Sequence, residues 1–487
     1  MSRKVLARGG SKVYDTTAWN LTMMYGLQAY MLPMELPRSA TAYASAKLPA
    51  TSSPVPNDQA VAVIIDGADD RSVAAAVRLV RDGIEVRVSR KSFNLQKQTF
   101  ARGSVVVTQL DQRGRRQDWR QAVHKSAQAL GLDASPVTTG FGPGDLPDLG
   151  GEYFVRVEPP RVALMMRDLI DAYGYGSIWH LLDHRLHLPH SQLNIDLPRL
   201  GTDLARYNVL ILPNRFGAHS ADWIPVIEAW VRAGGTLIAI GSGTNPFTKS
   251  ESKLSQVRLL ENVLDQLDEY ELAIWREWMA SEEIMPAPSS IWSNRVRAET
   301  AFPWTTYGGP RPAVEERKRR DAWQRLFMPN GALVAGRVDR EHWLTFGCQA
   351  PLPLLIRQGP VLMSKPGTQT AVRLGFFAAS KAPAASSGEA ESSGESSADT
   401  QEKPRPGWAA TPPGNDLYLR MSGLLWPEAT HRLANAAYLT RESVGAGQVI
   451  LFADSPNFRA STLGSARLLM NALVYGPGLG ARQPIRP

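Results

Sequence analysis

The chain has 487 residues, of which 43% are hydrophobic and 21% are charged, and its formal net charge is +8. These values are ordinary for a soluble globular protein and leave room for two or three domains, each with its own core. The single cysteine, Cys348, excludes an intramolecular disulfide and a cysteine-rich zinc site. No apolar run approaches the ~20 residues of a membrane span, and no nucleic-acid motif accompanies the basic excess, so we expect neither kind of partner.

Residues 1–56 are expected to form an N-terminal segment and a linker. Residues 1–10 are basic but lack the apolar stretch of a signal peptide, so none is visible and the compartment stays open. Residues 13–27 are rich in apolar and aromatic side chains, with no element before them to cover these groups. Residues 39–56 are rich in Ala, Ser and Pro, which is typical of a linker. We expect stretch 13–27 either to pack on the next unit or to present an apolar surface to a partner.

Residues 57–156 have the pattern of a small α/β unit. Apolar runs predict strands at 60–66, 84–88 and 104–107, and helical spacing predicts helices at 71–82 and 119–130. Gly83 and Gly131 stand just past the ends of the two helices, where glycine is favoured. About 100 residues are enough for such a unit to fold by itself.

Residues 157–380 are expected to form the main α/β core, completed by residues 414–487. Strands predicted at 161–166, 207–214 and 236–240 alternate with helices at 176–186 and 223–231. This alternation predicts right-handed crossovers and a doubly wound parallel sheet buried on both faces. A ligand site in such a sheet lies beyond the carboxyl ends of the strands, which here means the loops 214–219 and 241–248.

The remaining segments have less regular sequence patterns. Helical spacing recurs over 254–283, strands are expected within 331–346, and a last strand and helix are expected at 447–454 and 466–474. Residues 381–413 are dominated by Ala, Ser, Gly, Glu and Pro, which predicts a disordered insertion. The cluster Arg317-Lys318-Arg319-Arg320 follows two glutamates, and we interpret it as a solvated face rather than a phosphate-binding patch.

The C-terminal stretch carries a family resemblance. The sequence at 447–459, Gly-Gln-Val-Ile-Leu-Phe-Ala-Asp-Ser-Pro-Asn-Phe-Arg, together with Arg467–Leu473, resembles the C-terminal end of large bacterial zinc carboxypeptidases of the carboxypeptidase A type. The segments at 14–19, 178–183 and 342–347 are similar to other parts of the same proteins. The resemblance covers nearly the whole chain and implies a class I glutamine-amidotransferase-like fold that follows a catalytic zinc domain. The resembling proteins are often exported, and the compartment of this chain stays open.

The chain lacks the residues that bind the catalytic metal ion in that family. A carboxypeptidase site of this type holds its zinc with a His-x-x-Glu pair and a later histidine. The eight histidines are His124, His180, His184, His187, His190, His219, His342 and His431, and none has a glutamate three residues on. We therefore expect no catalytic zinc, and no other cofactor is indicated.

The loop Gly241-Ser242-Gly243 is the candidate site at the strand ends. By the resemblance, Gly241 stands near the cysteine position of an amidotransferase and Ser455 near its histidine position, and neither residue can do that chemistry. Ser242 is the nearest hydroxyl, but Ile240 and Thr244 stand where a Gly-x-Ser-x-Gly elbow needs glycine. We interpret the loop as a tight packing turn and assign no catalytic residue.

Three further groups of residues are candidate sites. His180 and His184 are four residues apart on one predicted helix face, which must also bury Trp179, and His187 follows; a weak metal site is the alternative to a surface histidine cluster. Cys348 is interpreted as a buried structural thiol although His342 is near in sequence. Arg459 and Asp454 are expected to form a structural ion pair.

These features favour a non-catalytic accessory region of a zinc carboxypeptidase-like protein, working with a separate carboxypeptidase catalytic domain. Two alternatives stay open: an active hydrolase that uses Ser242 or the His180 cluster, and a module that binds peptide or glycan at the strand ends.

Overall fold

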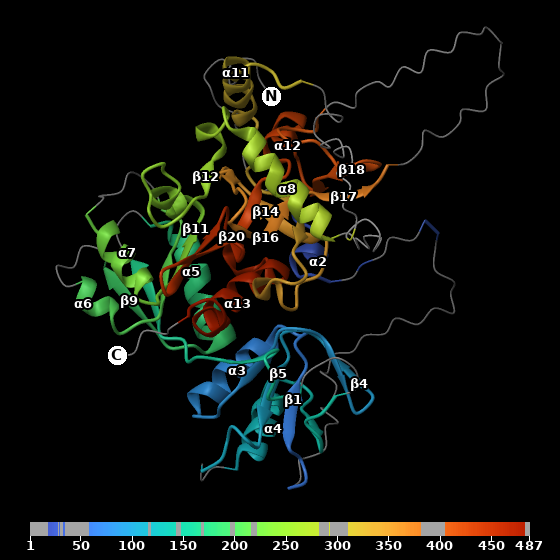
Figure 1. Ribbon diagram of the computed structural model, residues 1–487, viewed down its shortest axis with the longest axis vertical. Coiled ribbons are helices and arrows are strands. Elements are labelled where there is room, and N and C mark those ends of the chain that lie inside the picture. Colours follow the sequence, from blue (N-terminus) through green and yellow to red (C-terminus); the bar gives the residue numbers. More distant parts are fainter. Residues whose placement is uncertain are drawn as a thin grey trace.

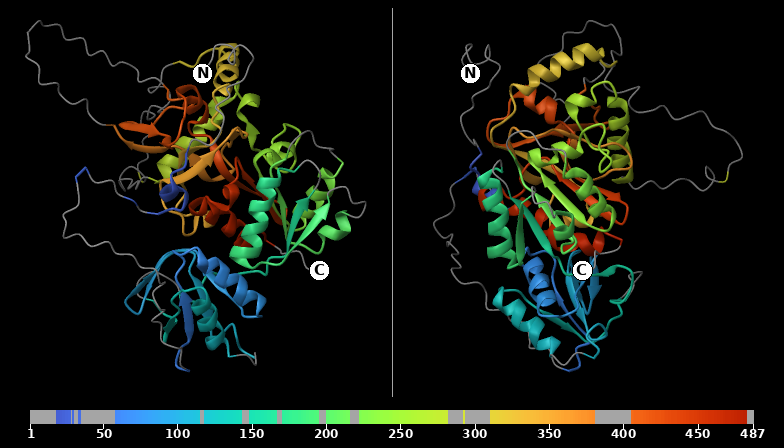
Figure 2. Two further views of the ribbon diagram at one scale, coloured as in Figure 1. Left: turned by 180° about the vertical axis from the view of Figure 1, so that it is seen from behind. Right: turned by 90° about the vertical axis from the view of Figure 1, so that its left-hand side faces the viewer.

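A computed structural model describes residues 18–27, 29, 33–34, 58–114, 118–142, 148–166, 170–194, 200–215, 222–281, 292, 310–380 and 405–482. A small N-terminal unit and a large mixed sheet lie at opposite ends of the long axis, in blue to cyan and in green to red respectively (Figure 1). Figure 2 shows the same separation from two further sides. The linker predicted at 39–56 and residues 381–404 of the predicted insertion lie outside the described residues.

The small unit is an antiparallel sheet with two helices. Its strand order is β6-β1-β5-β2-β7, and every neighbouring pair is antiparallel. The elements are β1 Ala62–Ile65, α3 Arg71–Arg81, β2 Arg87–Ser89, the hairpin β3 Phe93–Leu95 and β4 Gln98–Phe100, β5 Val105–Thr108, α4 Trp119–Ala129, β6 Ser135–Val137 and β7 Phe154–Arg156. Asp118 caps α4, since its carboxylate accepts from the N–H groups of Arg120 and Gln121.

The large unit begins with the alternation that the sequence predicts. Its first elements are β8 Val162–Met166, α5 Ala172–His180, a π-helical turn η1 Leu181–Leu186, β9 His190–Asn194, α6 Leu200–Leu204, β10 Val209–Leu212, α7 Ile224–Arg232, β11 Thr236–Ile240 and the 3₁₀ segment η2 Gly241–Phe247. Strands β9, β8, β10, β11 and β21 (Gly447–Phe452) pair in parallel in that order. Pro225 lies in the first turn of α7, where its missing N–H is harmless.

The prediction of a doubly wound parallel sheet is wrong. The large sheet has 12 strands, and beyond β21 every pairing is antiparallel. The strands β17 Phe376–Ala379 and β18 Asn415–Tyr418 pair with each other in a separate two-stranded sheet. Further elements of the large unit are β12 Arg258–Leu259, η3 Leu260–Asn262, α8 Leu267–Ser281, α11 Val314–Arg325, β13 Ala332–Val338, η4 Trp343–Thr345, β14 Leu352–Ile356, β15 Leu362–Met363, β16 Gln369–Leu374, β19 Arg420–Ser422, α12 Pro427–Leu433 and β20 Ala437–Val444. Only residues 445–446 join β20 to β21, and so short a connection cannot make the crossover that a parallel pair requires.

Helix α13 (Leu463–Leu479) lies at the boundary between the two units. It contacts α3 of the small unit and β10, β11 and β14 of the large sheet, and residues 465–477 are buried along its whole circumference. One hydrophobic core runs without interruption from Val63 of the small unit to Leu473 of α13. A helix that is buried on all sides packs against several layers at once, so α13 fixes the two units relative to each other.

Two predicted segments behave differently from expectation. Helix α2 (Leu21–Met24) packs through Ala18 and Met24 against Leu333 and Phe458 of the large unit, and not on the small unit as one version of the prediction has it. Residues 405–413, assigned to the disordered insertion, are described, and Trp408 to Ala410 are buried. Among the described residues, no helix combines the length and apolarity needed to cross a membrane.

Candidate functional site

The loop Gly241-Ser242-Gly243 lies where the sequence places it, at the carboxyl end of β11. Gly241 has a φ of +56°, and a Cβ there would lie 2.7 Å from Oδ1 of Asn214, which follows β10. A side chain at this position would therefore be strained and would collide with the neighbouring strand end. The glycine allows the loop to lie directly against Asn214.

Ser242 is held by the neighbouring strand end. Its Oγ lies 2.8 Å from Asn214 Oδ1 and 2.5 Å from the carbonyl oxygen of Arg215, and it accepts the Arg215 N–H at 2.8 Å. The Ser242 N–H donates to the same Asn214 Oδ1 at 3.0 Å. The one hydroxyl proton and the oxygen's acceptor capacity are thus used within the protein.

A serine–amide–carboxylate chain stands where a hydrolase would have a serine–histidine–carboxylate triad. Asn214 Nδ2 donates to Asp171 Oδ2 at 3.3 Å, so Asn214 lies between Ser242 and the carboxylate. An activated serine needs a base within hydrogen-bond reach that can take its proton. An amide has no such basicity, so this arrangement stabilises the loop and gives no route to an alkoxide.

Of the three histidines predicted as weak metal candidates, two stack on each other and the third lines a cavity of the small unit. The rings of His180 and His184 stack on the exposed side of α5 and η1, with centroids 4.9 Å apart. His187 has a left-handed backbone (φ +50°) that ends η1, and it lines a cavity formed with helices α3 and α4 of the small unit. Within the described residues, no group of three His, Cys, Asp or Glu side chains is placed to hold a metal ion. Trp179, which we expected to be buried on this helix, is half exposed.

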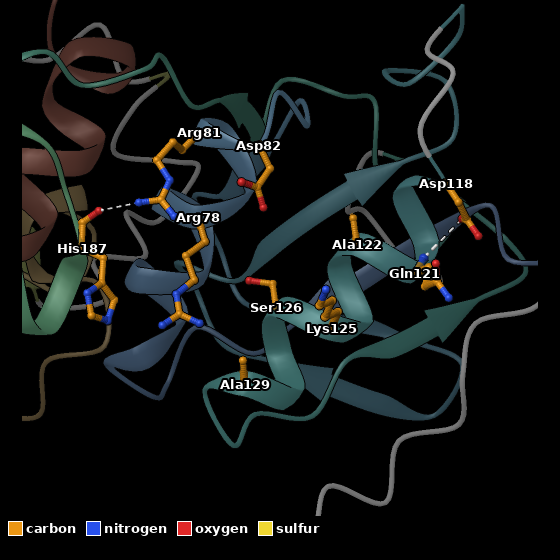
Figure 3. A pocket seen from close by; sticks show the side chains of 10 residues that line it. All are labelled: Arg78, Arg81, Asp82, Asp118, Gln121, Ala122, Lys125, Ser126, Ala129 and His187. Carbon is orange, nitrogen blue, oxygen red and sulfur yellow. Dashed lines mark hydrogen bonds between the residues drawn. The ribbon is translucent and has the colours of Figure 1, made fainter.

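The cavity beside His187 lies between that residue and helices α3 and α4 of the small unit, and its volume is about 590 Å³ (Figure 3). Its lining side chains are Arg78, Arg81, Asp82, Asp118, Gln121, Ala122, Lys125, Ser126, Ala129 and His187. Two of the charged groups have structural partners: Asp118 caps α4, and Arg81 Nη1 donates to the His187 carbonyl at 3.3 Å. The Ser126 hydroxyl is buried and bonds to none of the described residues, so no serine–histidine pair forms here.

Asp454, at the end of β21, is paired differently from the prediction. Its carboxylate accepts the Arg357 N–H at 2.7 Å and lies 3.3 Å from Arg357 Nη2. Arg459 instead extends over the ring of Tyr173 at 5.2 Å. The expected Arg459–Asp454 ion pair is therefore replaced by an Arg357–Asp454 pair, in which the arginine comes from the antiparallel half of the sheet.

Cys348 and His342 do not form a catalytic pair. Burial raises the pKa of the Cys348 thiol to about 12, so the nucleophilic thiolate is absent at neutral pH. His342 Nδ1 accepts the Leu344 N–H at 3.1 Å, and Nε2 lies 3.2 Å from Gln369 Oε1. Both ring nitrogens are thus used in structural hydrogen bonds.

Sequence reasoning missed a polar cluster on α13 that holds the two units together. Arg467 is fully buried and donates to the carbonyl oxygens of Gly67 and Asp69 at 3.0 and 2.9 Å, with Asp70 Oδ1 at 3.3 Å. Asn471 accepts from Arg467 Nε and donates to two carbonyl oxygens of the large unit, those of Leu344 and Phe346. An arginine and an asparagine four residues apart in an apolar helix were the available signal.

Comparisons with known proteins give no family. No family model and no curated protein matches the chain. Among solved structures, it is similar to the cytoplasmic protein STM3548 from Salmonella typhimurium at 11% identity, over 64% of this chain and 97% of that one, with a TM-score of 0.30. The cytoplasmic protein STM1381 from Salmonella typhimurium LT2 matches at 13% identity over 64% and 99%, with a TM-score of 0.28. A β-galactosidase from Bacillus circulans sp. alkalophilus matches at 11% identity over 73% of this chain and 35% of its own, with a TM-score of 0.29. TM-scores this low assign neither a fold nor a function.

Proposed function

We propose that this chain is a non-catalytic accessory region of a zinc carboxypeptidase-like protein and that it docks against a separate carboxypeptidase catalytic domain. The observation that carries the proposal is the exposed apolar face of segment 18–27. Trp19, Leu21, Tyr25 and Leu27 are 56%, 62%, 46% and 62% exposed, while Ala18 and Met24 are buried and hold the segment on the large unit.

Such a face suits an interface. Four large apolar side chains are exposed within ten consecutive residues, and a local excess of exposed apolar groups favours an interaction site. The segment is held in place by the hydrogen bond from the Ala18 N–H to the Gly331 carbonyl and by the Asn20 cap of α2. A partner therefore binds a preformed surface. In the resembling proteins, the corresponding segment directly follows the catalytic domain, which is why a carboxypeptidase domain is the occupant that we propose.

The strand-end geometry supports the non-catalytic part of the proposal. The Ser242 hydroxyl is bonded to Asn214 and Arg215, and the amide of Asn214 separates it from Asp171. A hydrolase mechanism at this loop would require a base that the arrangement does not supply.

The test is binding between the full chain and a purified zinc carboxypeptidase domain carrying His-x-x-Glu, taken from the reading frame directly upstream. We expect a complex in size-exclusion chromatography and isothermal titration calorimetry. The double variant Trp19→Ser/Tyr25→Ser should weaken it at least about tenfold, since each buried aromatic contributes on the order of 2 kcal/mol. Trp323→Ser is the matched control, because Trp323 is 51% exposed on the distant helix α11. No complex, or equal weakening by the control, would refute the proposal.

A further inference from the structure

A second cavity lies in the antiparallel part of the large unit, at the base of α11. It has a volume of about 270 Å³, near the lower end of the range for small-molecule pockets, about 300 to 1,000 Å³. Leu260, Leu264 and Leu267 form an apolar wall, and the other lining residues come mainly from α11, α12 and the segment 405–408. Five arginines line it against one carboxylate, that of Asp321.

Four of these arginines already have carboxylate partners, and one of them, Arg320, pairs with Glu316 at the surface. Arg311 and Arg405 both contact the buried carboxylate of Glu271. Arg432 donates to Asp321 at 2.8 Å and to Glu261 at 3.1 Å. The ion pairs of these other three arginines neutralise the inner side of the cavity and hold its walls together. The three arginines that form them therefore need no bound anion as a counter-charge.

Arg317 is different. It lies on the cavity side of α11, and its Nε is buried without a hydrogen-bond partner among the described residues. The other cations of the cluster are exposed and paired: Lys318 with Glu315, and Arg319 and Arg320 with Glu316, although Arg320 also borders the cavity. The interpretation of the cluster as a solvated face therefore holds for these three residues, and Arg317 is the exception.

Two uncharged donors line the same cavity. Trp408 is only 7% exposed, and its indole Nε1 is buried with no acceptor in the described part of the chain. His431 Nδ1 accepts the Gly407 N–H at 3.1 Å, which leaves the proton of the neutral ring on Nε2. A buried donor without an acceptor destabilises the protein, so the Nε of Arg317 and the indole Nε1 of Trp408 both favour a ligand that accepts hydrogen bonds.

We propose that this cavity binds a small organic anion. Its oxyanion group, a carboxylate or a phosphate, would accept hydrogen bonds from Arg317 and Trp408, and its apolar part would lie against Leu260, Leu264 and Leu267. A guanidinium and an indole N–H together suit an oxyanion, because both only donate and the guanidinium adds charge. The site is independent of the docking face and of the accessory function proposed above.

The test uses the full chain with four probes in calorimetry and thermal unfolding: phenylacetate, phenyl phosphate, inorganic phosphate and phenethylamine. We expect at least one aryl anion to bind saturably and raise the unfolding midpoint, while phenethylamine, the cation of similar size, does neither. The stronger of the two aryl anions identifies the head group. Inorganic phosphate should bind more weakly than phenyl phosphate, because it makes no contact with the leucine wall.

Arg317→Gln should weaken binding of the aryl anion about tenfold or more, since it removes a charged hydrogen bond. Arg319→Gln is the matched control, with the same charge change on the same helix, and should bind as wild type does. Because the Arg317 Nε has no hydrogen-bond partner among the described residues, Arg317→Gln without ligand should unfold close to the wild-type midpoint, which separates loss of binding from loss of folding. Trp408→Phe should weaken binding several-fold. The proposal is overturned if no aryl anion binds at millimolar concentration, or if Arg317→Gln and Arg319→Gln bind alike.

Discussion

The ionisation of His342 should make the stability of this protein strongly pH-dependent. The side chain begins the 3₁₀ turn η4 and is only 8% exposed. Its Nδ1 accepts the Leu344 N–H, so the neutral ring must carry its proton on Nε2, which faces Gln369 Oε1. Protonation would place a second proton on Nδ1, directly against the Leu344 N–H. The charged ring would therefore lose its capping hydrogen bond as well as its solvation.

The size of the effect follows from the pKa. Burial is the main cause that lowers the pKa of His342 from 6.5 to about 4; the charges of Arg441 and Arg102 act in the same direction, and Asp339 and Gln369 oppose them. A folded pKa below the unfolded value means that the unfolded chain binds the proton more tightly. The neutral ring therefore contributes its full stability above pH 6.5, and this contribution is lost as the pH falls toward 4. The lowered pKa corresponds to about 3 kcal/mol in total and to about 2.5 kcal/mol at pH 4.5.

The measurement is urea unfolding of wild type and His342→Asn at pH 7 and pH 4.5. Asparagine keeps an acceptor for the Leu344 N–H and does not titrate, so the variant should lose about 2.5 kcal/mol less than wild type between the two pH values. The carboxylates titrate in both proteins and cancel in this difference. His180→Asn, at an exposed position, should behave as wild type does. If wild type and His342→Asn show the same pH dependence within about 0.5 kcal/mol, the assignment to His342 is wrong.

Three further predictions follow from the described contacts. Arg467→Met removes a buried cation from between the two units and should lower the free energy of unfolding by about 3 to 5 kcal/mol. Arg459→Met, at an exposed position, should change it little. Equal effects of the two variants in urea titrations would show that Arg467 does not hold the units together. Ser242→Ala should cost about 1 to 2 kcal/mol of stability and leave no peptidase or esterase activity to lose, because Asn214 supplies no base; a hydrolytic activity that disappears in this variant would restore the hydrolase alternative. With its pKa near 12, the Cys348 thiol should react with a disulfide reagent at pH 8 far more slowly in the folded chain than in urea; equal rates would show that it is accessible.

The sequence predicts the parallel half of the large sheet but not its antiparallel half. Strands β8, β10 and β11 alternate with amphipathic helices, and that rhythm implies crossovers. In β20 and β21 nearly all residues are buried, so these strands show no alternation of polar and apolar residues. A fully buried strand has the same pattern whether its neighbour is parallel or antiparallel. The direction is set by the two-residue connection 445–446, which our prediction did not weigh because it included only the second of the two strands.

At the candidate site, the sequence predicted the position of residues along the chain but not their contacts. Ser242 was correctly placed at a strand end, but its partner Asn214 is 28 residues away and decides what the hydroxyl can do. Asp454 was assigned to Arg459, five residues along, while its actual partner Arg357 lies 97 residues earlier. The sequence shows which charged and polar groups need partners, and the fold determines which partner each group meets.

The segments that carry the family resemblance contribute mainly to architecture. The stretch 342–347 supplies the carbonyl oxygens that Asn471 binds, and Arg467, from the same helix, binds the small unit. Segment 18–27 lies on this helix as well, since a Cβ at Gly26 would come within 3.2 Å of the Cα of Gly464. The exposed apolar face at Trp19 to Leu27 is therefore attached to a helix that contacts both units. A surface held in this way loses little conformational freedom when a partner binds, so more of its buried apolar area is retained as affinity. This attachment, rather than the residues of the strand ends, is the feature on which the docking proposed above depends.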